Sequence, residues 1–218
     1  MSHLTMTEHY VVWYAIPSAN PTAASECLAK WKARGYHTAV LLDPNTPHID
    51  GVDFCMPVGQ YPGYWQASNL LFRKLPETPD IVVAGGDDIY PDPQADPQRT
   101  AREFYERFPD GYGVMQPIGD DLDGTDRICG SPWFGRAWLR QSYRGRGPFC
   151  PAYKSFFGDE ELFNIARQQG VLWQRRDLTQ YHDHWMRGNR KKTGYQVAND
   201  RHWERDKRTF QDRKTHGW

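Results

Sequence analysis

Short apolar runs alternate with amphipathic segments along the first half of the chain. Tyr10–Ile16, Thr38–Leu42 and Ile81–Ala84 are nearly continuous apolar runs, which is the pattern of strands that are buried on both faces. Between the first two runs, residues 22–34 place apolar side chains at helical spacing and stop at Gly35, which predicts a helix. Strand, helix and strand joined by short turns form a βαβ unit, so the sequence predicts an α/β fold with a mostly parallel sheet.

The later part of the chain alternates in the same way but less regularly. Further strands are predicted at Phe54–Val58, Gly113–Pro117 and Val171–Trp173, and further helices at Tyr64–Lys74, Thr100–Phe108 and Asp159–Gln169. Residues 128–139 have the pattern of a strand or a strand–helix junction, and a helix is expected near residues 201–213. Pro17 is expected to break the first strand.

Charge is unevenly distributed along a chain whose net charge is zero. Residues 185–218 carry ten Lys/Arg and four Asp/Glu, a net charge of +6, which leaves −6 for the rest. Tyr195, Trp203 and Phe210 lie among the basic residues, so this segment could follow a nucleic-acid backbone and stack bases. The alternative, which we favour, is a solvated extension that wraps around the domain.

Cysteine spacing and hydropathy argue against several classes of protein, namely zinc-binding, disulfide-rich and membrane-spanning ones. The four cysteines are widely spaced and form no CxxC pair, which argues against a zinc ribbon or a disulfide scaffold. The first residues lack the apolar core of a signal peptide, and no apolar stretch has the length of a membrane span. We therefore expect a cytoplasmic protein with reduced thiols and no membrane span.

Two adjacent carboxylates, Asp87 and Asp88, directly follow the third apolar run. Ligands of open α/β sheets bind beyond the carboxyl ends of the strands, and Pro17, Ser18 and Asp43 follow other strands at that edge. Adjacent carboxylates repel one another unless a cation lies between them, and oxygen ligands suit Mg²⁺ or Mn²⁺ shared with a phosphate. A simple turn is the other interpretation, and the residues alone favour the two about equally.

Further candidate groups lie in the second half. Asp159 and Glu160 open a predicted helix, where acids complement the helix dipole. From the residues alone we favour that role over a general base for an acceptor hydroxyl. His182 and His184 lie two residues apart, so in an extended segment they point the same way and suit a metal or phosphate. The acidic stretch 120–126 lacks the terminal Glu of a calcium loop, so it is predicted to be a solvated loop.

The order of these features resembles GT-A-type nucleotide-sugar-dependent glycosyltransferases, most like the inverting group called family two and its phage-encoded relatives. Pro79–Pro91 resembles the DxD metal-binding segment of the family, and Gly158–Leu162 resembles its EDxxL catalytic-base segment. His182–His184 resembles the HxH found after the last core strand. The similarity covers roughly residues 10–186. The chain departs from the pattern where Gly86 replaces the first acid of DxD and Gly158 replaces the acid before the base.

The resemblance implies a GT-A-type Rossmann-like sandwich with a mostly parallel central sheet flanked by helices. One catalytic domain would span residues 1–186, with a donor half of about 1–95 and an acceptor half of about 96–186, followed by a basic, aromatic extension at 187–218. It also implies a nucleoside diphosphate sugar as donor and a divalent metal, Mn²⁺ or Mg²⁺. The implied site residues are Asp159 as catalytic base; Asp88, Asp87, His184 and His182 for the metal; Pro17, Ser18, Asp43, Asn69 and Gly86 for the donor; and Glu160, Trp133 and Trp185 on the acceptor side.

The acceptor and two rival functions stay open at this point. The acceptor would be a glycan or, through the basic extension, a modified DNA base that is flipped out for transfer. A nucleotidyltransferase uses a similar sheet with paired carboxylates, but usually carries a glycine-rich loop with Lys or Arg after the first strand. Residues 17–21, which follow the first predicted strand, contain no Gly, Lys or Arg. The other rival is a sugar- or nucleotide-binding module, or a phage structural module, without turnover.

Overall fold

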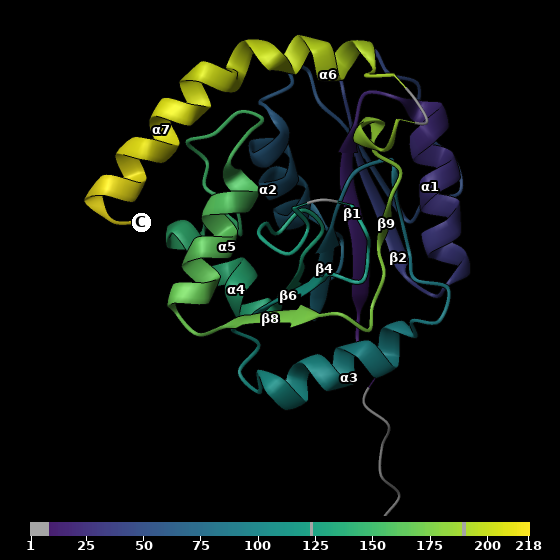
Figure 1. The fold of residues 1–218 in the computed structure, drawn as a ribbon. Coiled ribbons are helices and arrows are strands. Elements are labelled where there is room, and N and C mark those ends of the chain that lie inside the picture. The colour runs from purple at the N-terminus through teal and green to yellow at the C-terminus, as the bar shows by residue number, and fades with distance from the viewer. Residues whose placement is uncertain (1–8, 123, 189–190) are drawn as a thin grey trace, which may run out of the picture.

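A seven-stranded sheet forms the centre of the computed structural model, which describes residues 9–122, 124–188 and 191–218 (Figure 1). Its strand order is β3-β2-β1-β4-β7-β6-β8, and β7 runs antiparallel to both of its neighbours while the other pairs are parallel. The predicted mostly parallel sheet is therefore confirmed. The strands are β1 (Val12–Ser18), β2 (His37–Leu42), β3 (Phe54–Pro57), β4 (Ile81–Ala84), β6 (Val114–Pro117), β7 (Trp133–Gly135) and β8 (Leu172–Arg175).

Helices flank this sheet, and two of them form the C-terminal part of the described chain (Figure 1). The α-helices are α1 (Pro21–Ala33), α2 (Tyr64–Lys74), α3 (Pro97–Arg107), α4 (Arg136–Gln141), α5 (Gly158–Gln168), α6 (Gly194–Asn199) and α7 (Trp203–His216). Short 3₁₀ turns lie at Ser142–Gly145, Trp185–Arg187 and Asp200–His202. None of the helices in the described ranges is long and apolar enough to cross a membrane.

Successive side chains of β1 enter two different cores, which explains why its sequence is a continuous apolar run. Val12, Tyr14 and Ile16 pack in a cluster with residues of α1 and α3. Trp13 and Ala15 pack on the opposite face with residues of α2 and α5. Both faces of the central strands are thus covered by helices, as expected for parallel strands.

Buried donors fix the turn that follows β4. The Tyr14 hydroxyl donates to the Gly86 carbonyl oxygen at 2.7 Å, and the Trp31 indole Nε1 donates to the Ile89 carbonyl oxygen at 2.8 Å. The Tyr14 and Trp31 rings stack with centroids 3.9 Å apart. A Cβ atom on Gly85 would lie 2.5 Å from the Tyr14 hydroxyl oxygen, so only glycine fits against this anchor. The core therefore dictates where the carboxylates after β4 are placed.

Some predicted boundaries need correction. The first strand continues through Pro17 to Ser18, because Pro17 lies beyond the last residue of β1 that pairs with β4, and a proline is tolerated at a strand end. The strand–helix junction at residues 128–139 is confirmed as β7 followed by α4, and the helix expected near residues 201–213 is α7. Sequence reasoning missed α6 and the two-stranded antiparallel sheet of β5 (Ile89–Tyr90) and β9 (Tyr181–His182).

We expect Trp31→Phe to lower the free energy of unfolding by about 1 kcal/mol more than Trp138→Phe, as measured by urea unfolding. Both indoles are almost fully buried, so the two substitutions remove similar ring area. The Trp31 N–H has a carbonyl partner, whereas the buried Trp138 N–H has no hydrogen-bond partner among the residues that the structure describes. Equal losses in the two variants would show that the anchor on Ile89 adds nothing to stability.

Candidate functional site

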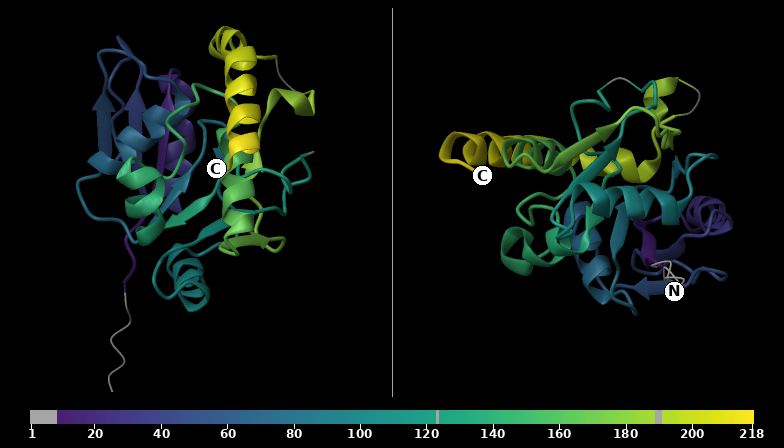
Figure 2. Two further views of the ribbon diagram at one scale, coloured as in Figure 1. Left: turned by 90° about the vertical axis from the view of Figure 1, so that its left-hand side faces the viewer. Right: turned by 90° about the horizontal axis from the view of Figure 1, so that it is seen from below.

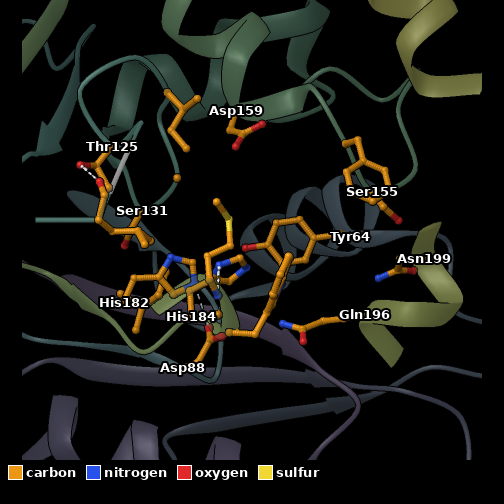
Figure 3. Close-up of a pocket in the computed structure, with 18 of the residues that line it drawn as sticks. Tyr64, Asp88, Thr125, Ser131, Ser155, Asp159, His182, His184, Gln196 and Asn199 are labelled. Atoms are coloured by element: carbon orange, nitrogen blue, oxygen red, sulfur yellow. Dashed lines mark hydrogen bonds and ion pairs between the residues drawn. The ribbon is translucent and has the colours of Figure 1, made fainter. Parts of the chain in front are cut away.

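A cavity of about 840 Å³ opens beyond the carboxyl ends of β4 and β6 (Figure 3). The turn after β4 and the loop after β6 form two of its walls, and the start of α5 forms a third. The segment from β9 to the following 3₁₀ turn closes a fourth side, and residues of α6 and the start of α7 complete the cavity. Its position agrees with the ligand sites of other open α/β sheets.

One side of the cavity carries a carboxylate and two imidazoles. Asp88 Oδ1 lies 3.4 Å from His182 Nε2, and the rings of His182 and His184 have centroids 4.7 Å apart. Backbone pairing brings these groups together, because Ile89 pairs with His182 across β5 and β9, and the Asp183 N–H donates to the Asp88 carbonyl oxygen at 2.8 Å. Three of the four predicted metal ligands, Asp88, His182 and His184, line the cavity.

A buried ion pair between Asp120 and Arg187 holds the backbone of His182 in place. Asp120 Oδ2 accepts a hydrogen bond from the His182 N–H at 2.9 Å, and Arg187 binds the carboxylate of Asp120 and the carbonyl oxygen of His182. Arg187 also bonds Asp121 and lowers the pKa of that exposed carboxyl. The prediction of a solvated acidic loop is therefore wrong for Asp120, whose side chain is only 4% exposed because it binds Arg187.

The opposite side of the cavity carries Asp159 at the start of α5 (Figure 3). Its Oδ1 accepts the Glu160 N–H at 3.1 Å, and its backbone carbonyl accepts the Cys129 N–H at 3.2 Å. Burial raises the pKa of Asp159 and outweighs the lowering effect of the backbone N–H groups. Burial and the neighbouring Asp159 also raise the pKa of Glu160. Asp159 is thus a carboxyl group with an increased proton affinity that faces the cavity.

Steric reasons account for both glycines that depart from the family pattern. A Cβ atom on Gly86 would lie 2.7 Å from Asp88 Oδ1, so a side chain there would displace the carboxylate. A Cβ atom on Gly158 would lie 2.6 Å from ring carbons of Trp65. Trp65 is 5% exposed and packs against Phe149, so the indole fills the space that an acidic side chain would need.

The residues predicted to face the donor form a neighbouring cluster at the ends of β1 and β2. The Ser18 hydroxyl donates to Asp87 Oδ2 at 2.5 Å, and the Asp43 N–H donates to the Ser18 carbonyl oxygen at 3.3 Å. Burial raises the pKa of Asp43. Pro17 is buried in β1. Pro17, Ser18 and Asp43 do not line the cavity, and neither does Asp87, one of the predicted metal ligands, whereas Gly86 does. Asp87 points toward β1, while Asp88 points toward His182.

Two predicted site residues lie in the core instead. Asn69 is 2% exposed, and its amide bonds the backbone N–H and carbonyl of Phe149. Trp133 is 1% exposed, and its indole donates to Gln180 Oε1 at 2.5 Å. The prediction that Asn69 faces the donor and Trp133 faces the acceptor is wrong, because both side chains are buried and hydrogen-bonded within the core. Trp185, also predicted on the acceptor side, does line the cavity.

Sequence reasoning missed most of the wall that the C-terminal residues contribute. Gln196, Asn199 and Trp203 line the cavity, and Trp203 lies edge-on to Phe156 with ring centroids 5.0 Å apart. Lys192 Nζ lies 4.7 Å from the ring centre of Trp185. The aromatic residues interleaved with basic ones were the available signal, but they gave no position relative to the sheet.

Comparison with known proteins identifies the fold. No family model matches the chain, and no curated protein matches it by sequence. The catalytic domain of Drosophila β1,4-galactosyltransferase 7 in complex with xylobiose superimposes with a TM-score of 0.54 at 13% identity, over 88% of this chain and 80% of that one. A mutant of the same enzyme in complex with manganese, UDP-Gal and xylobiose gives a TM-score of 0.53 at 14% identity, over 88% and 79%. The chain therefore has the GT-A fold of these galactosyltransferase structures. The narrower family-two and phage-encoded affiliation stays a prediction.

We expect Asp159→Asn to increase the free energy of unfolding at pH 7, and the gain should shrink as the pH falls toward 4. Burial raises the folded-state pKa above the unfolded value, so the native state loses stability as pH rises from about 3.9 through the raised pKa. The asparagine does not titrate and avoids this loss. Urea unfolding at pH 4.5 and 7 measures the effect, with Asp50→Asn as control because that side chain is fully exposed. A variant that is no more stable than wild type at pH 7 would contradict the desolvation of Asp159.

Proposed function

We propose that the protein is a metal-dependent glycosyltransferase that moves a sugar from a nucleoside diphosphate sugar to an acceptor hydroxyl, with inversion. One observation carries the proposal: a single cavity holds Asp88, His182 and His184 on one side and Asp159 on the other (Figure 3). The donor phosphates and the acceptor hydroxyl need such opposed groups. The fold shared with a galactosyltransferase that was solved with manganese and UDP-Gal supports the same function.

The residues around Asp88 suit a divalent cation by their chemistry. Within the described ranges, no three His, Cys, Asp or Glu side chains already surround one point at metal-binding distance. Asp88 and His182 are in contact, however, and His184 lies beside them. One carboxylate and two imidazoles can together hold a divalent transition-metal ion, and the carboxylate oxygens suit Mn²⁺. When bound, the cation would neutralise the charge that develops on the diphosphate leaving group.

Asp159 is the proposed general base. Its raised pKa increases its affinity for the proton of the acceptor hydroxyl, which is useful as that oxygen attacks the anomeric carbon. Direct displacement inverts the anomeric centre and needs one carboxylate near the acceptor, whereas hydrolysing glycosidases need two around the bond. Ser18 and Asp43, at the ends of β1 and β2, are proposed to face the nucleoside.

A sugar hydroxyl is the acceptor that we favour over a DNA base. Several basic side chains of the extension are already bound within the protein, which weakens the case for a phosphate-binding strip. Arg213 binds Glu161, Arg205 donates to the Ala152 carbonyl oxygen, and Lys192 pairs with Asp200. Salt-dependent gel shifts with double- and single-stranded DNA test this choice. Binding at low salt that weakens with added salt would restore the nucleic-acid acceptor.

The products released from a nucleotide sugar separate the rival functions. UDP-Gal, chosen because the structural neighbour binds it, and other nucleotide sugars are incubated with Mn²⁺ and the protein. Release of nucleoside diphosphate supports the transferase, release of pyrophosphate supports a nucleotidyltransferase, and stabilisation without release supports a binding module. A thermal-shift screen of donors with and without Mn²⁺ comes first, because a bound donor raises the melting temperature.

We expect Asp159→Asn to lower the transfer rate about 10²- to 10⁴-fold, the usual contribution of a general base. Donor binding should be unaffected, so the thermal shift produced by the active donor and Mn²⁺ should match that of wild type. Steady-state kinetics and thermal shift measure the two quantities. Turnover near the wild-type rate would disprove the role of Asp159 as base.

We expect His182→Ala and His184→Ala to abolish the part of the thermal shift by UDP that depends on Mn²⁺, and chelation of the metal should do the same in the wild type. Each substitution removes one proposed ligand, and the carboxylate and single imidazole that remain bind the cation weakly. His48→Ala is the control, because that side chain is exposed and lies outside the cavity. If both variants retained the full Mn²⁺-dependent shift, the metal would have to bind elsewhere.

A further inference from the structure

The segment that leads into α5 is held by a carboxylate from α7. Asp206 is fully buried and accepts the N–H groups of Lys154, Ser155 and Phe156 at 2.8 to 3.2 Å. Three successive N–H groups around one anion form a nest, a geometry that binds negative charge strongly. Asp206 therefore fixes the conformation of the backbone at residues 154–156, although it lies almost fifty positions later in the sequence.

The residue between this nest and α5 has an unfavourable backbone conformation. Phe157 has φ 65°, in the left-handed region that non-glycine residues rarely adopt. Its ring packs against Trp203 and Phe210 of α7, with centroid distances of 4.9 and 5.2 Å. Such conformations persist only where the surrounding structure imposes them. Because Phe157 directly precedes Gly158 and Asp159, this packing fixes the direction in which α5 begins.

A second charged contact holds α5 on the other side of Asp159. Glu161 is fully buried, and both of its oxygens accept from the guanidinium of Arg213, at 2.7 and 2.8 Å. The hydroxyls of Tyr143 and Tyr153 donate to the same carboxylate at 2.7 and 2.6 Å. Removal of the Arg213 charge would leave a buried carboxylate with two neutral donors, which is a strongly unfavourable state.

We propose that α7 acts as a clamp on both sides of Asp159, and that Asp206 and Arg213 are positioning residues for the reaction. This inference rests on the proposed function, in which Asp159 is the base. α7 lies next to the start of α5 (Figures 1 and 2), and neither Asp206 nor Arg213 lines the cavity. Their effect on the reaction therefore passes through the backbone at residues 154–161 and not through contact with a substrate.

Loosening the clamp has two expected consequences. A carboxylate displaced by about 1 Å loses much of its advantage, and such misplacement can cost about 100-fold in rate. Looser packing would also let more water reach Asp159, so its pKa would fall toward the ordinary value and the acid limb of the pH–rate profile would move to lower pH. Glu160 and the Cys129 thiol are the titratable groups that interact with Asp159, and neither substitution below changes them.

The test compares Arg213→Gln, Arg213→Lys and Arg208→Gln in the full chain. Arg208 lies on the same helix, is exposed, and within the described ranges donates only to a carbonyl of its own helix, so its variant is the matched control. We expect Arg213→Gln to lower kcat about 10- to 100-fold with an unchanged donor KM and a shifted acid limb. Arg213→Lys should restore part of kcat, because it restores the charge. An unchanged kcat or an unshifted acid limb in Arg213→Gln would overturn the proposal.

Hydrogen exchange tests the clamp without any turnover. Residues 154–161 should exchange faster in Arg213→Gln than in the control, while the strands of the sheet keep wild-type protection. Asp206→Asn is the second variant, since it keeps one oxygen acceptor and tests the nest if Arg213→Gln does not fold. Unchanged exchange at residues 154–161 in both variants would refute the clamp even if the protein were an active transferase. A wild type that releases no nucleoside diphosphate would instead refute the proposed function and leave the exchange result standing.

Discussion

The pairing of Ile89 with His182 and Tyr90 with Tyr181 joins two distant parts of the chain, and the side of the cavity that carries Asp88 and His182 depends on it. Two residues per strand give few hydrogen bonds, each with a net contribution of about 1 kcal/mol, so this pairing cannot stand alone. Trp31 holds the Ile89 carbonyl from the core, and Asp120 with Arg187 holds His182 from the other side. The small sheet therefore connects the turn after β4 with the segment around His182, each of which is held in place separately. The contact between Asp88 and His182 depends on this connection.

The same sheet edge shows which parts of the site sequence alone can predict. Apolar runs with two buried faces identify β1, β2 and β4, and the rule that ligands bind beyond strand ends then selects the pair Asp87 and Asp88, of which the family pattern favours Asp88. The family pattern adds Asp159 and the two histidines, and the structure places all four around one cavity. Asp88 and Asp159 were predictable because each is close in sequence to an element with a strong hydrophobic pattern, whereas the two histidines were found from their own spacing and the family pattern.

Other parts depend on contacts that have no sequence signature. Asp206 binds backbone N–H groups, which every segment offers, so nothing in the sequence points to its partners. Asp120 looks like a member of a solvated acidic loop until Arg187 is found beside it. Asn69 and Trp133 are residue types common in binding sites, but burial assigns them to packing. Gly86 and Gly158 looked like weaknesses in the motifs, whereas Asp88 and Trp65 occupy the space that larger side chains would require.

Because of the way α7 is attached, the arrangement of the site can be lost while the fold of the sheet is still intact. Asp206 is the one buried residue of α7, so the helix contributes little to the main cores. It is held by a few polar contacts and by the partly buried rings of Trp203 and Phe210, which pack on Phe157. Detachment of such an element costs less free energy than unfolding of the sheet. On warming, a population would accumulate in which the sheet and both cores are intact but α5 is no longer fixed. Inactivation would then precede melting, and the melting temperature would overstate the range in which the protein works.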